Sequence, residues 1–164
     1  MSKPPRRGVS PRPAVSRPTL PPVLNSLADM FHDIEPPLLN TPTAELVVQG
    51  ARLDLHGTVR FVGLTLGADE RTATLGWAPQ HPVSIRFEGG LEPLGGLVLT
   101  ISELTRCEVS LQTGTPGALE YFELRRDPEV TLVFFFEGGT MRLSGASFAG
   151  EILLADSDDG GSVQ

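Results

Sequence analysis

Two glutamates that stand before paired glycines are the first residues whose chemistry could matter. The tetrapeptide Phe-Glu-Gly-Gly occurs twice, with Glu88 in the first copy and Glu137 in the second. Two carboxylates at equivalent turns could hold calcium or act as an acid and base pair. Acids at strand ends also aid solubility and oppose edge pairing. Because no Gly-Lys-Ser/Thr follows the glycines, we expect two tight β-turns rather than a phosphate-binding loop.

Asp54 and His56 form a second candidate pair. They stand two residues apart in an alternating run, so they share the polar face of one strand and their side chains could meet. The other histidines, His32 and His81, do not complete a metal-ligand spacing. No Gly-x-Ser-x-Gly elbow is present, and Cys107 as the single cysteine cannot build a thiolate zinc site. We therefore expect no metal, no cofactor and no catalytic centre.

The basic residues and the acidic residues occupy different parts of the chain. Residues 1–22 contain seven of the fifteen prolines and no acid. The five basic residues there are Lys3, Arg6, Arg7, Arg12 and Arg17. Eight arginines face twenty acidic residues in the remainder, which gives it a formal charge of −12. This composition predicts a disordered proline-rich arm on an acidic body that repels nucleic acid and anionic membranes.

The stretch 23–35 has the spacing of an amphipathic helix. Its apolar residues Leu24, Leu27, Phe31 and Ile34 follow one another at intervals of three, four and three. Pro36 and Pro37 would end the helix and begin a linker over residues 36–43. Two interpretations remain open. The helix could dock in cis on its own body, or in trans in the groove of a partner protein.

Residues 44–154 alternate apolar and polar side chains in short runs separated by turn residues. The strongest runs are Val83–Phe87 and Val130–Phe136, and the alternation changes phase after Gly63, where we expect a bulge. The pattern predicts an all-β domain, an antiparallel sandwich or barrel of about nine to ten short strands. A polar tail over residues 155–164 follows.

The run Val130–Phe136 contains three consecutive phenylalanines, so its two faces are both apolar. Val133 and Phe135 point away from the face shared by the other apolar residues. Either the strand is covered on both faces, with the helix as one cover, or the second face is a partner site. The candidate partner-binding residues are Leu24, Leu27, Phe31, Ile34, Val133 and Phe135.

The strand texture of the segments V-x-I-x-F-E-G-G and V-T-L-V-F-F-F-E-G-G resembles that of small all-β bacterial immunity proteins of toxin–antitoxin loci. The resemblance covers residues 44–154. It implies binding and neutralisation of a cognate toxin, often through an acidic surface, and it assigns no binding residue.

We therefore expect a non-catalytic protein-binding module, an adaptor, assembly component or inhibitor. The alternative is a small-molecule-binding or hydrolytic β-barrel with a site near Asp54 and His56 or near Glu88 and Glu137. No apolar run approaches the roughly 20 residues of a membrane span, and the first residues lack an apolar signal-peptide core, so we expect a cytoplasmic protein. The oligomeric state stays open at this point.

Overall fold

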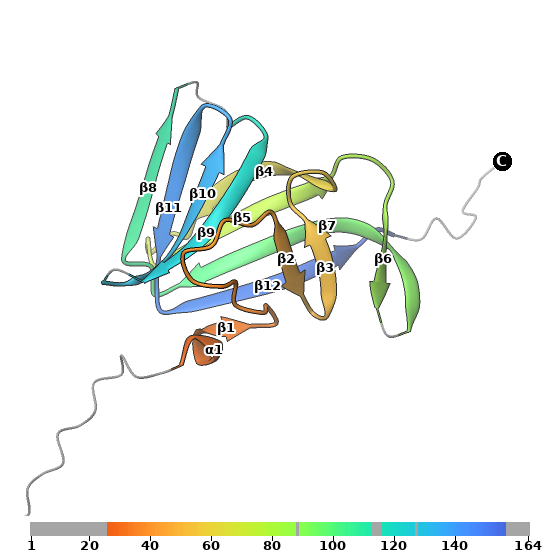
Figure 1. Cartoon of the computed structure of the whole chain (residues 1–164), viewed down its shortest axis with the longest axis horizontal. Helices are drawn as coiled ribbons and strands as arrows, with labels where there is room; N and C mark the ends of the chain where they lie inside the picture. Colours follow the sequence, from red (N-terminus) through yellow and green to blue (C-terminus); the bar gives the residue numbers. More distant parts are fainter. Residues whose placement is uncertain (1–25, 88, 113–115, 127, 157–164) are drawn as a thin grey trace, which may run out of the picture.

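The computed structural model describes residues 26–87, 89–112, 116–126 and 128–156 (Figure 1). One sheet contains, in spatial order, β1 (Phe31–His32), β12 (Ser147–Leu154), β7 (Gly90–Ser102), β5 (Thr72–Pro79) and β4 (Val59–Leu66), and β6 (Ser84–Phe87) pairs with one end of β7. The second sheet contains β8 (Arg106–Leu111), β11 (Gly139–Ser144), β10 (Val130–Phe136) and β9 (Leu119–Arg126). A separate hairpin joins β2 (Glu45–Val48) to β3 (Ala51–Asp54).

The all-β prediction is confirmed. The described residues form twelve strands and one short helix, α1 (Leu27–Met30), and the sheets do not close into a barrel. The strand pairs are antiparallel, as expected, apart from the parallel contact of β1 with β12. The number of strands exceeds the nine to ten that we expected. The count includes the very short strands β1, β2 and β3, which have only two to four residues each.

Alternate residues of both sheets enter one shared core. Trp77 of β5 packs against Phe134 of β10 with ring centroids 5.9 Å apart, and Phe61 of β4 packs against Phe136 at 5.0 Å. These rings join the two sheets, because they come from facing strands of different sheets. Burying large aromatic and aliphatic side chains is the main favourable term in such a fold. The indole Nε1 of Trp77 is buried without a hydrogen-bond acceptor among the described residues.

Both Phe-Glu-Gly-Gly segments lie at hairpin turns, as expected. Phe87 pairs with Gly90 between β6 and β7, and Phe136 pairs with Gly139 between β10 and β11. Each connection therefore has two residues. Gly138 has a φ of 85°, the left-handed conformation that such turns need and that glycine adopts without a steric penalty. The repeated tetrapeptide is explained by turn geometry.

Two register shifts interrupt the strand pairing, and the first accounts for the phase change that the sequence shows after Gly63. The pairing of β4 with β5 shifts between Phe61 and Gly63, so Val62 is the extra residue and is 61% exposed. The pairing of β9 with β10 shifts at Phe136, whose partner is Leu119, so Glu120 has no partner of its own. A bulge reverses the face of the residues beyond it. This is why Leu119 and Phe122 are both buried although their positions differ in parity.

The predicted helix over 23–35 is wrong in its extent. The helix ends at Met30, Phe31–His32 form a strand parallel to β12, and Asp33 has a φ of 61°. A four-residue helix has little stability of its own, whereas Phe31 gains a stacked contact with Phe148 at 5.0 Å. The turn at Asp33 then directs Ile34 into the core, where it bridges to Val48. The apolar spacing was correct, but tertiary packing decided the conformation.

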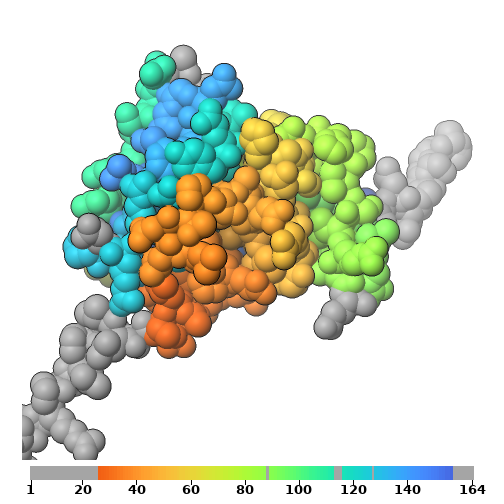
Figure 2. Space-filling model, viewed as in Figure 1, coloured from red at the N-terminus to blue at the C-terminus, as the bar shows by residue number. Residues whose placement is uncertain are grey.

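Residues 36–43 do not behave as a free linker. They cross to the edge of β9 that faces away from β10, where the N–H of Asn40 donates to the carbonyl of Leu124 at 2.8 Å. Thr43 and Phe122 exchange two backbone hydrogen bonds, of 3.0 and 2.8 Å. Figure 2 shows this orange segment lying against the cyan surface of β9. The segment from Ser26 to Thr43 therefore belongs to the folded body, which begins earlier than the predicted boundary at Ala44.

Within the described ranges, no helix has the length and apolar character needed to cross a membrane.

Candidate functional site

The face of the second sheet that points away from the core carries a cluster of aromatic and charged side chains. We call it the outer face. Its members follow from the register of β8, β11, β10 and β9, since residues directly opposite one another share a face. They are Arg106, Glu108, Ser110, Tyr121, Glu123, Arg125, Thr131, Val133, Phe135, Thr140, Arg142 and Ser144.

A stacked aromatic pair is the most structured part of the outer face. Tyr121 of β9 and Phe135 of β10 are directly opposite, with ring centroids 4.5 Å apart and an interplanar angle of 21°. The guanidinium carbon of Arg125 lies 5.5 Å from the centroid of the Phe135 ring. Cation–π attraction and stacking together hold these three side chains in one arrangement.

Glu123 orients the arginine of this cluster. The Nη2 and Nε atoms of Arg125 lie 2.7 and 2.8 Å from Oε2 of Glu123. Glu123 is 14% exposed and Arg125 is 35% exposed, so the carboxylate lies beneath and the guanidinium reaches further toward solvent. A contact to two of the three guanidinium nitrogens restricts the arginine rotamer. The cluster of Tyr121, Glu123, Arg125 and Phe135, which we call the aromatic–arginine cluster, is therefore preorganised.

Val133, in contrast, is not available as a contact residue. It is 1% exposed although it lies on the outer face. Its direct cross-strand neighbours are Glu123 and Arg142, and the methylene groups of these two side chains can cover a central valine. The covering element is not the segment predicted as a helix, because its residues Phe31 and His32 pair with β12 of the other sheet. Of the two interpretations, the structure has β10 covered at Val133 and partly accessible at Phe135.

An open hollow adjoins the aromatic pair. It has a volume of about 360 Å³ and lies where the outer face meets the β10–β11 hairpin. Tyr121 and Phe135 form part of its wall, and Gln112, Glu120 and Thr140 contribute polar groups. The hollow is therefore lined by both aromatic rings and hydrogen-bonding groups.

The second candidate pair, Asp54 and His56, is committed to backbone contacts. Asp54 Oδ1 accepts from the backbone N–H of His56 at 2.8 Å, which caps the turn after β3. The Nδ1 atom of His56 lies 2.6 Å from the carbonyl oxygen of Leu119. A carbonyl only accepts, so Nδ1 carries the proton and donates it. The two side chains therefore do not form an acid–base dyad with each other.

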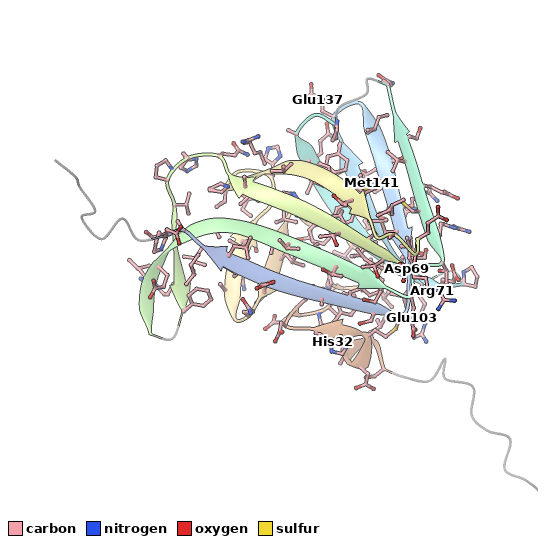
Figure 3. All side chains as sticks on the ribbon, turned by 180° about the vertical axis from the view of Figure 1, so that it is seen from behind. His32, Asp69, Arg71, Glu103, Glu137 and Met141 are labelled. Carbon is pink, nitrogen blue, oxygen red and sulfur yellow. The ribbon has the colours of Figure 1, made fainter. Side chains whose placement is uncertain are left out.

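The first candidate pair from the sequence, Glu88 and Glu137, cannot be assembled from the described residues. Glu88 lies outside the described residues, and Glu137 is exposed at the tip of the β10–β11 hairpin (Figure 3). His32 lies beside α1, well separated from Glu137 in that view. Among the described residues, no group of three or more His, Cys, Asp or Glu side chains is placed to hold a metal ion. Burial raises the pKa of the Cys107 thiol, which makes it a weaker nucleophile at neutral pH.

The predicted partner-binding residues differ in how far they are buried in the structure. Leu24 lies outside the described residues, and Leu27 is partly buried against the core. Phe31 and Ile34 are each 7% exposed and pack in cis. Phe135 keeps accessible surface and joins the aromatic–arginine cluster. Sequence reasoning missed Tyr121 and Arg125, because only the register of β9 against β10 brings them beside Phe135.

Comparison with known proteins finds little similarity to this chain. No family model matches the sequence, and no curated protein matches it. Among solved structures, the chain is similar to the crystal structure of an uncharacterized protein from Neisseria gonorrhoeae. The similarity covers 58% of this chain and 92% of that chain, with a TM-score of 0.41 and 13% sequence identity.

Proposed function

We propose that this chain is a non-catalytic protein-binding module, of the adaptor, assembly or inhibitor type, whose outer face contacts the partner. The observation that carries the proposal is the preorganised aromatic–arginine cluster beside an open hollow. Tyrosine and arginine are enriched among the residues that dominate binding energy at protein interfaces. A rigid aromatic pair also loses little side-chain entropy on binding.

The charge of the body suits such a role. Outside the first 22 residues the chain carries a formal charge of −12, which steers basic partners toward it and disfavours polyanions. An arginine on a largely acidic body adds a directional donor for a carboxylate or backbone carbonyl of the partner. Cys107 as the single cysteine accords with action in a reducing compartment such as the cytoplasm.

The competing interpretation is that the aromatic–arginine cluster only stabilises the sheet. Cross-strand aromatic pairs contribute roughly 0.2–1 kcal/mol. The two interpretations differ in what happens when Arg125 is removed. A purely structural cluster would lose a little stability, while a contact surface would lose its partner at unchanged fold.

The test is affinity capture from the native host with the full chain and two variants. Arg125→Ala removes the accessible arginine of the cluster. Arg52→Ala is the matched control, because Arg52 forms an exposed 2.9 Å ion pair with Glu45 on the β2–β3 hairpin. We expect a stoichiometric partner that the full chain and Arg52→Ala retain and Arg125→Ala loses. A partner held equally by both variants would place the contact elsewhere.

A second arm of the same experiment tests the N-terminal segment. A chain beginning at Ser26 keeps Phe31, Ile34 and residues 36–43, which the body needs, and lacks only residues 1–25. Retention of the partner by this chain supports the outer face as the contact. Loss of the partner would mean that residues 1–25 contain the binding site. If no form of the protein captures a stoichiometric partner, the binding-module proposal fails.

A further inference from the structure

β8 forms an edge of the second sheet that none of the described residues covers. It lies at the left margin of the sheet in Figure 1, beside β11. Its six residues pair with β11 without a register shift, it contains no proline, and its two charged side chains, Arg106 and Glu108, form an ion pair with each other at 3.6 Å. Natural proteins usually blunt an edge strand with prolines, unpaired charges or a bulge, because an open edge invites another strand.

The alternation of backbone hydrogen bonds shows which groups β8 leaves open. The N–H of Gln112 donates to the carbonyl of Gly138 at 2.8 Å, and the register continues regularly to Arg106 opposite Ser144. In an antiparallel pair every second residue points its N–H and C=O at the neighbour. The even-numbered residues therefore bond to β11. The backbone groups of Cys107, Val109 and Leu111 point out of the sheet edge.

The side chains of the same three residues form an apolar row on the core side. Cys107 packs partly against the core, Leu111 is half-buried, and Val109 is 46% exposed. Their partners in β11 are Leu143, Met141 and Gly139, of which Leu143 and Met141 are buried in the core. The core of the domain thus extends to this edge and ends there with incompletely covered apolar surface.

We propose that two copies of this chain associate through β8, antiparallel, about a two-fold axis that passes through Val109. This register places Cys107 opposite Leu111 of the second copy and Val109 opposite its own counterpart. All the outward backbone groups of the strand are then paired, in about six hydrogen bonds. The two apolar rows meet as one, and the two second sheets become a continuous sheet.

Charge disfavours the neighbouring register with its axis at Glu108, and strand length disfavours the one at Ser110, which would set Cys107 opposite position 113, beyond the end of β8. Directly opposite residues must lie on the same face, so the symmetry axis can pass only through a residue. An axis at Glu108 would set that glutamate against its counterpart, and like charges directly opposite are destabilising. The axis at Val109 sets Glu108 against Ser110 and leaves no like charges opposed. An isologous contact requires such self-complementarity.

The axis at Cys107 is disfavoured by backbone geometry. It would set Val109 opposite Thr105, and it would leave Leu111 opposite Glu103, beyond the start of β8. The N–H of Thr105 already donates to the carbonyl of Ser144 at 2.9 Å. Fewer backbone groups would be paired, and an apolar residue would face a charged one.

The first test is the oligomeric state of the full chain by sedimentation equilibrium over a wide range of protein concentration. Val109→Lys sets two cations against each other across the proposed axis. Val62→Lys is the matched control, because Val62 is an exposed valine on the β4 edge, 61% exposed against 46% for Val109. We expect a dimer for the full chain and Val62→Lys, and a dissociation constant at least about tenfold higher for Val109→Lys. Circular dichroism verifies that both variants fold.

The second test measures the register by disulfide formation. In the Cys107→Ser, Val109→Cys variant, the two thiols lie opposite each other at about 5.5 Å between Cα atoms, within the range of a disulfide. The unmodified chain, with Cys107 four residues out of register from its counterpart, stays uncross-linked. The reverse result would overturn the axis. A full chain that is monomeric throughout, or a dimer that Val109→Lys leaves unchanged, would overturn the interface itself. Capture of an unrelated strand-donating protein by a monomeric chain would do so too.

Discussion

The two edges of the second sheet are treated in opposite ways. At the β9 edge, residues 39–43 return from the first sheet and bond to Phe122 and Leu124. At the β8 edge, the described residues add nothing beyond the strand itself. An edge that the chain seals with its own backbone contributes to the stability of the monomer. An edge without a partner strand can pair with a second chain, so the proposed association would use the flank opposite to the one that the chain seals for its own stability.

The largest effect should come from the segment that leads to the sealed flank. Phe31→Ala removes a 7% exposed ring that stacks on Phe148, so we expect the free energy of unfolding to fall by about 3 kcal/mol. Urea denaturation followed by circular dichroism measures it. His32→Ala, at the exposed neighbouring position, should change stability by less than about 0.5 kcal/mol. Equal effects of the two variants would mean that the segment is not part of the core.

Two glycine substitutions test how tightly the chain packs near each flank. Gly139 lies in β11 beside the β8 edge, and Gly150 lies in β12 beside the segment that leads to the β9 edge. A Cβ at Gly139 would lie 2.3 Å from the carbonyl oxygen of Ser110, so Gly139→Ala must displace the backbone of β8. A Cβ at Gly150 would meet the side chain of Ile34 at 2.6 Å, which can partly adjust. We expect losses of about 3 kcal/mol and about 1–2 kcal/mol, respectively, in the free energy of unfolding.

Gly76→Ala is the control for this pair. Its Cβ would have no atom within 4 Å, and its φ is not left-handed. We expect it to be neutral or slightly stabilising, because alanine restricts the unfolded chain more than glycine does. A smaller loss for Gly139→Ala than for Gly150→Ala would contradict the tight backbone contact of β8 with β11.

Proline substitutions probe the hydrogen bonds of the two edges directly. The N–H of Thr43 donates to Phe122, so Thr43→Pro removes a bond that seals the β9 edge and should cost about 2 kcal/mol. The N–H of Val109 points away from β11, so Val109→Pro should cost the monomer less than about 1 kcal/mol. Thermal unfolding at low protein concentration separates this cost from dimerisation. A Val109→Pro loss as large as that of Thr43→Pro would show that the β8 edge is not open.

The smallest effect concerns the thiol on the open flank. Desolvation by burial raises the pKa of the Cys107 thiol above its ordinary value. The folded chain therefore holds less thiolate than the unfolded chain at any pH near that value. The preference of the folded chain for the neutral thiol therefore contributes fully to the free energy of unfolding below the pKa of the unfolded chain. That contribution is lost as the pH rises through the pKa of the folded chain. We expect iodoacetamide to react more slowly with the native protein than with the urea-unfolded protein at pH 8, and equal rates would contradict the burial of the thiol.

The alternation of side chains along the chain was enough to predict the strands. Val130–Phe136 reads as a strand because its apolar residues repeat with period two, and the glycines after Phe136 mark the turn. The phase change near Gly63 marked the bulge of β4 to within one residue. These features depend on neighbours in sequence, so local pattern carries them.

Pattern failed where distant residues decided the outcome. The apolar spacing in 23–35 fits a helix, but the ring of Phe148, over a hundred positions away, holds Phe31 in a strand instead. The candidate surface met the same obstacle, because Val133 and Phe135 share a face but differ in exposure. Their cross-strand neighbours differ, and those neighbours follow from register rather than from position in the chain.

By itself, the sequence determined the all-β class, the separation of the basic residues of 1–22 from the acidic remainder, and the turns at both Phe-Glu-Gly-Gly segments, because composition, periodicity and backbone preferences act locally. Only the tertiary structure decided that Asn40 and Thr43 bond to the β9 edge of the second sheet, while no described residue pairs with the outer edge of β8. It alone placed Tyr121, Phe135 and Arg125 together. The physical reason is that strand pairing and ring packing join residues far apart in the chain, and their energies exceed the small local preference for a short helix or a free linker.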